Sequence, residues 1–149
     1  MFDRTRAYRT ITKGVLSEYP IIKTKLVNLP ERIATEEARL TAIRSASAES
    51  AAVSGSGTNT RQERDIAIIA ECDRLRNELR LAKKDVDCIE RALAVLDEKE
   101  RRVIELMDIQ QQPGAIERLC AELGYERTKI YGIRNGALDK FSAVYNGAK

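Results

Sequence analysis

The chain has 149 residues, of which 43% are hydrophobic, 33% are charged and 5% are aromatic, and it contains neither tryptophan nor histidine. This length suits one or two small domains rather than a large enzyme fold, and the lack of histidine removes the commonest general base and metal ligand. No uncharged apolar run is long enough to cross a membrane, and the N-terminus has no signal-peptide pattern, so we expect a cytoplasmic protein with no membrane segment.

The sequence contains no residue pattern that indicates an enzyme. The three cysteines, Cys72, Cys88 and Cys120, are widely spaced, and Cys72 and Cys120 occupy apolar positions of helical patterns, where cysteine behaves as a small hydrophobic residue. Neither a disulfide nor a zinc site is indicated. No glycine-rich loop precedes a Lys-Ser or Lys-Thr pair, so no nucleotide-triphosphate site is expected. We expect no catalysis, no metal and no cofactor.

The N-terminal segment is basic and amphipathic. Residues 3–19 predict a helix with Tyr8, Ile11, Val15 and Tyr19 on its apolar face. The first 25 residues carry six cations against two acids, which fits either a solvated helix face or a second contact with phosphates. Pro20 is expected to end or restart this helix.

A heptad-like pattern follows Pro20. Its apolar members are Ile22, Leu26, Leu29, Ile33, Leu40 and Ile43. Because Pro30 lies inside the pattern, we expect a kink, or two segments that meet near Asn28. Residues 45–60 are small and polar and include two glycines, so they predict a flexible loop.

Residues 60–96 carry the most regular pattern in the sequence. Thr60 and Glu63 have the spacing of a capping box, and an apolar residue then recurs at alternating spacings of four and three without a miss. This seam comprises Ile68, Cys72, Leu75, Leu79, Ala82, Val86, Ile89, Leu93 and Leu96. It can be buried against the 22–43 helix of the same chain, against a second copy, or against both. We predict a homodimer through the 68–96 heptads.

A new domain is expected to begin near Asp97. Asp97 and Glu100 repeat the capping-box spacing, and Val103, Ile104 and Met107 predict the core face of the helix that follows. Residues 109–114 are polar and end in Pro-Gly, which predicts a turn.

Residues 116–141 have the pattern of two short helices that meet at a tight corner. Gly124 is expected to end the first helix, and Glu126 lies beside the first turn of the second, where a carboxylate meets the positive end of the helix dipole. The predicted buried faces are Ile116, Leu119, Cys120 and Leu123 on the first helix and Ile130, Ile133, Ala137, Leu138 and Phe141 on the second. Two helices joined in this way form a helix-turn-helix, whose second helix can enter a major groove.

The other side of the second helix predicts a DNA-binding face. Arg127, Thr128, Lys129 and Asn135 are expected to read base edges, and Tyr131, Arg134 and Lys140 to contact phosphates or fix the register. Residues 127–149 carry five cations against one acid, whereas residues 97–126 carry four cations against eight acids. The electrostatic field of this uneven charge distribution would orient the second helix toward phosphates.

Two glycines interrupt this predicted helix, one turn apart. Gly132 and Gly136 each cost helix stability relative to alanine. Either they let the backbone approach another surface closely, or the helix breaks or frays at this point.

Several segments of this region resemble sigma factor region four. They are Leu123-Gly124, residues 127–134 and residues 137–141, and residues 96–104 are similar to the helix that opens that region. The layout of the whole chain also resembles phage and mobile-element regulators of the RinA and ArpU type. The resemblance implies that Arg127, Thr128 and Lys129 touch bases. The later base-contacting position of the sigma pattern is Gly132 here, so the target is expected to differ from the sigma type.

We therefore expect an all-α protein with an N-terminal helical hairpin or coiled coil (1–96) and a C-terminal helix-turn-helix domain (97–149). Its expected function is sequence-specific binding of double-stranded DNA as a transcriptional regulator of phage or mobile-element origin, with RNA polymerase as a further candidate partner.

Two alternatives stay open. A DNA-packaging oligomer of the small-terminase kind would also join a helix-turn-helix to oligomerising helices, and it should form a ring larger than a dimer. A coiled-coil interaction module would keep the motif only as a stable corner and would show no salt-dependent affinity for DNA.

Overall fold

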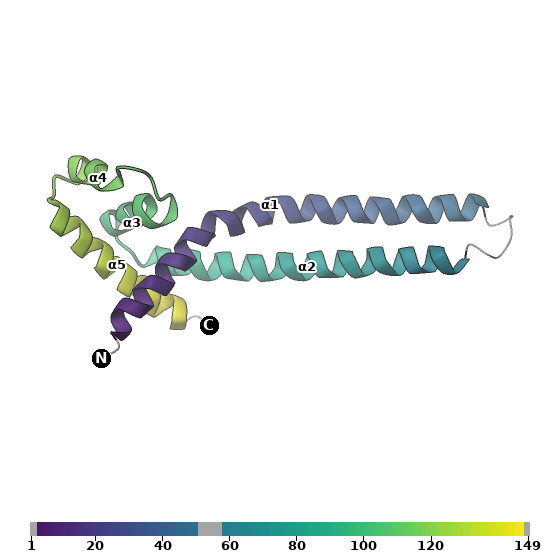
Figure 1. Cartoon of the computed structure of the whole chain (residues 1–149), viewed down its shortest axis with the longest axis horizontal. Helices are drawn as coiled ribbons and strands as arrows, with labels where there is room; N and C mark the ends of the chain where they lie inside the picture. Colours follow the sequence, from purple (N-terminus) through teal and green to yellow (C-terminus); the bar gives the residue numbers. More distant parts are fainter. Residues whose placement is uncertain (1–2, 51–57, 148–149) are drawn as a thin grey trace. The chain divides into compact units, whose positions relative to one another are not determined.

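A computed structural model describes residues 3–50 and 58–147 of the chain, and these residues contain no strand (Figure 1). The helices are α1 (Arg4–Ser50), α2 (Thr58–Ala94), α3 (Glu98–Ile104), α4 (Ala115–Leu123) and α5 (Arg127–Gly147). A π-helical turn (Glu105–Ile109) follows α3 directly. The predicted all-α class is confirmed.

The described residues form two compact units. The smaller unit is Thr24–Lys83, and the larger unit comprises the described residues up to Lys23 and from Lys84 onward. The domain boundary predicted near Asp97 falls at the turn between α2 and α3, inside the larger unit. No helix among the described residues has the length and apolar character needed to span a bilayer.

In the smaller unit α1 and α2 lie side by side and antiparallel (Figure 1). Leu29 and Ile33 of α1 are buried together with Leu75 of α2, and Leu79 packs against them. Ion pairs connect the two helices along their length, including Lys25–Glu78 at 3.3 Å, Arg32–Glu71 at 3.8 Å and Arg44–Asp65 at 3.7 Å. Because such exposed pairs contribute little free energy, apolar burial carries most of the stability here.

The seam predicted on residues 68–96 is largely buried within a single chain. Seven of its nine members are buried, and Leu79 and Leu93 are half-buried. In the smaller unit its partner is the α1 pattern that begins at Ile22, as Leu29 and Ile33 show. Homodimerisation through these heptads remains a prediction, and a second copy would have to use other side chains or displace α1.

The prolines do not divide α1, so the expected end or restart at Pro20 and the expected junction near Asn28 are wrong. The helix runs through Pro20 and Pro30 without a break, although each proline lacks the N–H that an interior helical position donates. Buried residues lie just before or just after both prolines, at Tyr19, Leu29 and Ile33. Buried packing before Pro20 and on both sides of Pro30 accompanies the continuous helix, and both proline residues are exposed.

The predicted loop and its capping box are also placed differently. Residues 45–50 belong to α1, and α2 begins at Thr58 rather than at Thr60. Thr60 is thus an interior residue of the helix. The remainder of the predicted loop, residues 51–57, lies outside the described residues.

The buried face of the first turns of α1 differs from the predicted one. Thr12, Leu16 and Tyr19 are buried, whereas Tyr8 and Ile11 are 54% and 64% exposed. The Tyr19 hydroxyl donates to Glu90 Oε1 of α2 at 2.9 Å. Burial, together with this bond, raises the pKa of Tyr19 to about 12.

The start of α3 agrees with the sequence. Asp97 is the N-cap residue, and its carboxylate accepts from the backbone N–H of Glu100 at 2.8 Å. This hydrogen bond holds the pKa of Asp97 below its usual range. Val103 and Ile104 are fully buried, as predicted.

Candidate nucleic-acid interface

The corner between α4 and α5 is a three-residue turn, residues 124–126. Gly124 has a φ of 69°, the left-handed conformation that favours glycine, and its N–H donates to the carbonyl of Cys120 at 3.0 Å. At the other end of the turn, the carbonyl of Glu126 accepts the first helical bond of α5, from the N–H of Ile130 at 3.1 Å. The chain therefore leaves α4 and enters α5 with defined backbone geometry at both ends.

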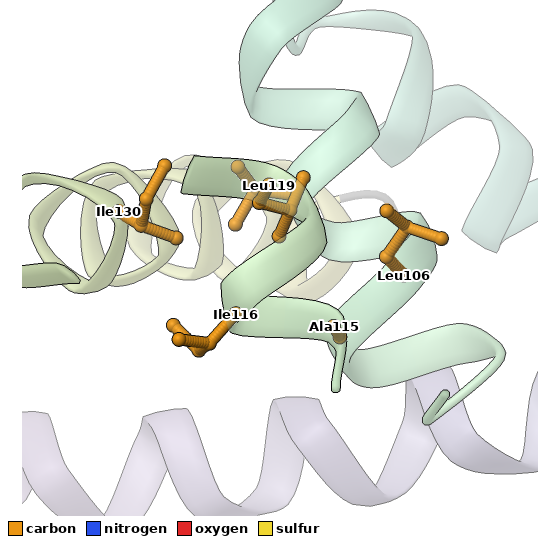
Figure 2. Close-up of a cluster of buried hydrophobic side chains, with 6 residues drawn as sticks. Leu106, Ala115, Ile116, Leu119 and Ile130 are labelled. Atoms are coloured by element: carbon orange, nitrogen blue, oxygen red, sulfur yellow. The ribbon is translucent and has the colours of Figure 1, made fainter. Parts of the chain in front are cut away.

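An apolar cluster fixes which side of α5 faces inward. Ile130 belongs to one buried cluster with Ala115, Ile116 and Leu119 of α4 and with Leu106 of the π-helical turn (Figure 2). Further along α5, Ala137, Leu138 and Phe141 are fully buried. The predicted apolar faces of both helices are confirmed.

The first turns of α5 are open to solvent. Arg127, Thr128 and Lys129 are exposed, and Tyr131 is 41% exposed. Among the residues that the structure describes, Arg127 forms an ion pair with Glu117 at 3.6 Å, and both side chains are about two-thirds exposed. A pair of this kind is weak in water, so the Arg127 guanidinium is available to another anion.

Arg134 is held inside the unit instead. Its guanidinium binds both carboxylate oxygens of Asp108, with Nε donating to Oδ2 at 3.0 Å. The Asp108 side chain is 1% exposed and that of Arg134 is 18% exposed. Asp108 points inward from the π-helical turn, a feature that adds one residue to a helical turn and is often found at functional positions. The pair links this turn to α5.

Lys140 also binds a buried carboxylate, although it stays more open than Arg134. Its ammonium donates to Glu100 Oε1 at 2.7 Å, and the Glu100 side chain is 9% exposed. This hydrogen bond raises the pKa of Lys140. The second oxygen of Glu100, Oε2, is buried with no hydrogen-bond partner among the described residues. Loss of Lys140 would leave that carboxylate without its cation.

The predicted binding face is therefore divided along α5. Near the N-terminus of the helix Arg127, Thr128, Lys129 and Tyr131 point outward, whereas Asn135 is half-buried. One turn beyond Asn135, Asp139 accepts two hydrogen bonds from Arg9 of α1, at 2.8 and 2.7 Å. The structure brings four of the seven predicted residues to one open surface, and it engages Arg134 and Lys140 in ion pairs within the unit.

The glycines inside α5 do not break the helix. Gly132 and Gly136 are exposed, and α5 is continuous from Arg127 to Gly147. A Cβ atom added at either glycine would meet nothing within 4 Å. Of the two expectations for these residues, a helix that ends here is wrong.

Tyr125 brings together two lysines at the corner, a grouping that the sequence analysis missed. The Lys99 ammonium donates to the Tyr125 hydroxyl at 2.6 Å, and the Lys129 ammonium lies 4.9 Å from the ring centre. The hydrogen bond from Lys99 lowers the pKa of Tyr125, and the charges of Lys99 and Lys129 add to this effect. Lys99 lies 26 residues before Tyr125, so no local spacing reveals the grouping.

The described residues contain no group of His, Cys, Asp or Glu side chains that could hold a metal ion. Cys72, Cys88 and Cys120 are free thiols, and the first two are buried.

Comparison of the chain with protein-family models, with curated proteins and with solved structures found no match.

Proposed function

We propose that this protein binds double-stranded DNA sequence-specifically through α4 and α5 and acts in the cytoplasm as a transcriptional regulator of phage or mobile-element type. The observation that carries the proposal is the first turns of α5. They follow a three-residue turn, are anchored by a core on one side, and expose Arg127, Thr128 and Lys129 on the other. This is the arrangement by which a helix-turn-helix inserts its second helix in a major groove.

Each exposed side chain has a proposed role. Arg127 offers donors that suit the O6 and N7 acceptors of guanine, and the Thr128 hydroxyl can donate or accept. The Lys129 ammonium can donate to a base edge or to the phosphate beside it. Tyr131 lies farther along the open face, where its hydroxyl can reach a phosphate. Asn135 is half-buried, so it can reach only a base that comes close to the helix backbone, a close approach that the missing side chain of Gly132 would favour.

Arg134 and Lys140 are assigned a positioning role. Each binds a buried carboxylate, Asp108 and Glu100 respectively, and a move to a phosphate would leave that carboxylate unpaired at considerable cost. Their ion pairs instead hold α5 against the π-helical turn and α3. The proposed direct contacts with DNA are therefore Arg127, Thr128, Lys129, Tyr131 and Asn135.

A regulator of this size would bind DNA most simply as a homodimer, because two copies read two half-sites. RNA polymerase is a second proposed partner, by analogy with sigma factor region four. Both proposals rest on the sequence pattern and the resemblance.

The experiment is a selection of bound fragments from random duplex DNA, followed by fluorescence anisotropy on the selected duplex and on an unrelated one. Arg127→Ala should cost about 1–3 kcal/mol on the selected duplex and relax the preference at one base pair. Arg91→Ala is the matched control, because Arg91 is exposed on α2 and has no ion pair among the described residues. No enrichment in the selection, or equal losses for the two variants, would refute the proposal.

A further inference from the structure

The Lys99–Tyr125–Lys129 cluster lies at the corner that precedes the proposed recognition helix. Lys99 belongs to the first turn of α3, Tyr125 to the turn after α4, and Lys129 to the first turn of α5. Three separate elements thus supply the cluster. Lys99 and Lys129 are exposed, and Tyr125 is half-buried where it packs against the apolar cluster of Figure 2.

The two ammonium groups approach different parts of Tyr125. Lys99 Nζ lies 2.6 Å from the hydroxyl oxygen and 5.1 Å from the ring centre, so it sits beyond the hydroxyl end rather than over the ring face. Lys129 Nζ lies 4.9 Å from the ring centre, within the range of a cation–π contact. One aromatic side chain therefore contacts both lysines. The distance between the two Nζ atoms cannot exceed the sum of their distances from the ring centre, 5.1 and 4.9 Å.

Both lysines keep donors free for an anion. An ammonium has three N–H donors, and the Tyr125 hydroxyl takes one of those on Lys99. Among the described residues, no carboxylate lies within ion-pairing distance of either lysine, although the charge of Asp97 acts on Lys99 from farther away. The hydrogen bond from Lys99 and the charges of both lysines lower the pKa of Tyr125. Two neighbouring cations that form no ion pair among the described residues favour binding of an anion.

We propose that Lys99 and Lys129, held by Tyr125, form a binding site for the phosphate backbone of duplex DNA. The proposal rests on the proposed function and adds to it a contact from α3, outside the helix-turn-helix itself. The site binds one phosphate between the two ammonium groups, or two successive phosphates of one strand. By fixing the backbone beside the first turn of α5, it sets the register with which Arg127 and Thr128 meet base edges.

DNA is favoured over an acidic protein surface because of where Lys129 lies. It shares the open first turn of α5 with Arg127 and Thr128, so a polyanion that is long enough to extend along this turn can reach the cluster and these two donors. Duplex DNA presents phosphates and base edges at once, and a single ligand can then satisfy the cluster and the helix together.

The test is the salt dependence of duplex binding by the full-length chain carrying Lys99→Gln. Glutamine keeps an N–H donor for the Tyr125 hydroxyl but removes the charge, so the local fold is retained. A lost phosphate contact should reduce the slope of log affinity against log salt by about 0.9, which corresponds to roughly eightfold weaker binding at 0.1 M salt. The loss should be the same on the selected duplex and on an unrelated one, because phosphates carry no sequence information.

Two further variants distinguish the loss of this phosphate contact from the effect of a lower net charge on the protein. Lys83→Gln removes the same charge from an exposed position of the smaller unit that has no ion pair among the described residues, and it should leave the slope unchanged. Lys99→Arg keeps the charge and should retain the slope of the unmodified protein. An unchanged slope for Lys99→Gln, or a loss confined to the selected duplex, would overturn the phosphate site.

The failure of this inference and of the proposed function can be told apart. If the unmodified protein binds no duplex, the proposed function fails. If it binds and Lys99→Gln binds equally well, only the phosphate site fails. Binding of polyglutamate that depends on Lys99, without any binding of duplex, would assign the cluster to an acidic protein partner and would overturn both.

Discussion

Removal of the Arg134 side chain should lower the stability of the larger unit, and it should remove no direct contact with DNA. In Arg134→Ala the Asp108 carboxylate keeps its buried position, with 1% of its side chain exposed, but loses both hydrogen bonds from the guanidinium. Breaking a buried pair from one side typically costs 3–5 kcal/mol, because a charge is left buried without compensation. Arg134 itself is 18% exposed, so water can replace part of its role. We therefore expect the free energy of unfolding to fall by about 3 kcal/mol, the lower end of this range.

The assay is thermal unfolding followed by circular dichroism. For a chain of this length, a loss of about 3 kcal/mol corresponds to a Tm roughly 6–12 °C lower. Arg91→Ala is the control and should stay within about 0.5 kcal/mol, as exposed substitutions generally do.

A double variant separates the ion pair from binding. Asp108→Leu with Arg134→Met replaces both charges by apolar groups, a change that often restores the stability of a buried pair. If Arg134 only positions α5, the double variant should bind the selected duplex nearly as well as the unmodified protein. A loss of less than 1 kcal/mol in Arg134→Ala would contradict the buried pair. Unfolding at the normal temperature together with weak duplex binding by the double variant would make Arg134 a direct DNA contact.

Three other predictions concern the glycine, an exposed carboxylate and the assembly. Gly132→Gln has open space around it and should raise the stability of α5 by somewhat less than about 1 kcal/mol, yet weaken or redirect binding to the selected duplex; unchanged affinity and preference would refute close approach at this residue. The pKa of Glu122 is lowered to about 2, first by its hydrogen bond from Arg102, so its stabilising contribution is present above its ordinary pKa of 4.5 and is lost as the pH falls toward 2. The difference in Tm between the unmodified protein and Glu122→Gln should therefore be largest near pH 6 and should shrink as the pH falls through 2, and a difference at pH 2 as large as that at pH 6 would contradict this. Light scattering at tens of micromolar should give the mass of a dimer, and a monomer mass would rule out the predicted assembly.

The sequence could predict the features that depend on local geometry. Gly124 ends α4 because its left-handed φ is accessible to glycine, and Asp97 caps α3 through a bond to an N–H three residues later. The buried face of α5 follows from the period of the α-helix, which brings Ile130, Ala137 and Phe141 to one side.

The partners of the charged residues could not be predicted in this way. Arg134, Lys140 and Asp139 bind side chains that lie 26, 40 and 130 residues away in the sequence. Helical periodicity shows which way a side chain points but not what lies opposite it. The open and the engaged parts of the predicted face therefore look alike in sequence.

The prolines of α1 are a second case in which local sequence rules did not predict the structure. A local rule ends a helix at an interior proline, but burial of Tyr19 and Leu29 beside Pro20 and Pro30 outweighs it. Tertiary packing thus extends a helix that local preference would divide, and only the packed structure reveals it.

The central claim, that the first turns of α5 meet DNA, is tested most directly by NMR on the isotope-labelled full chain. Backbone amide shifts would be followed while the selected duplex is added. The largest changes should fall in residues 124–132 and at Lys99, with little change in the smaller unit, Thr24–Lys83. Changes confined to residues 24–83, or no change at concentrations where anisotropy reports binding, would contradict the claim.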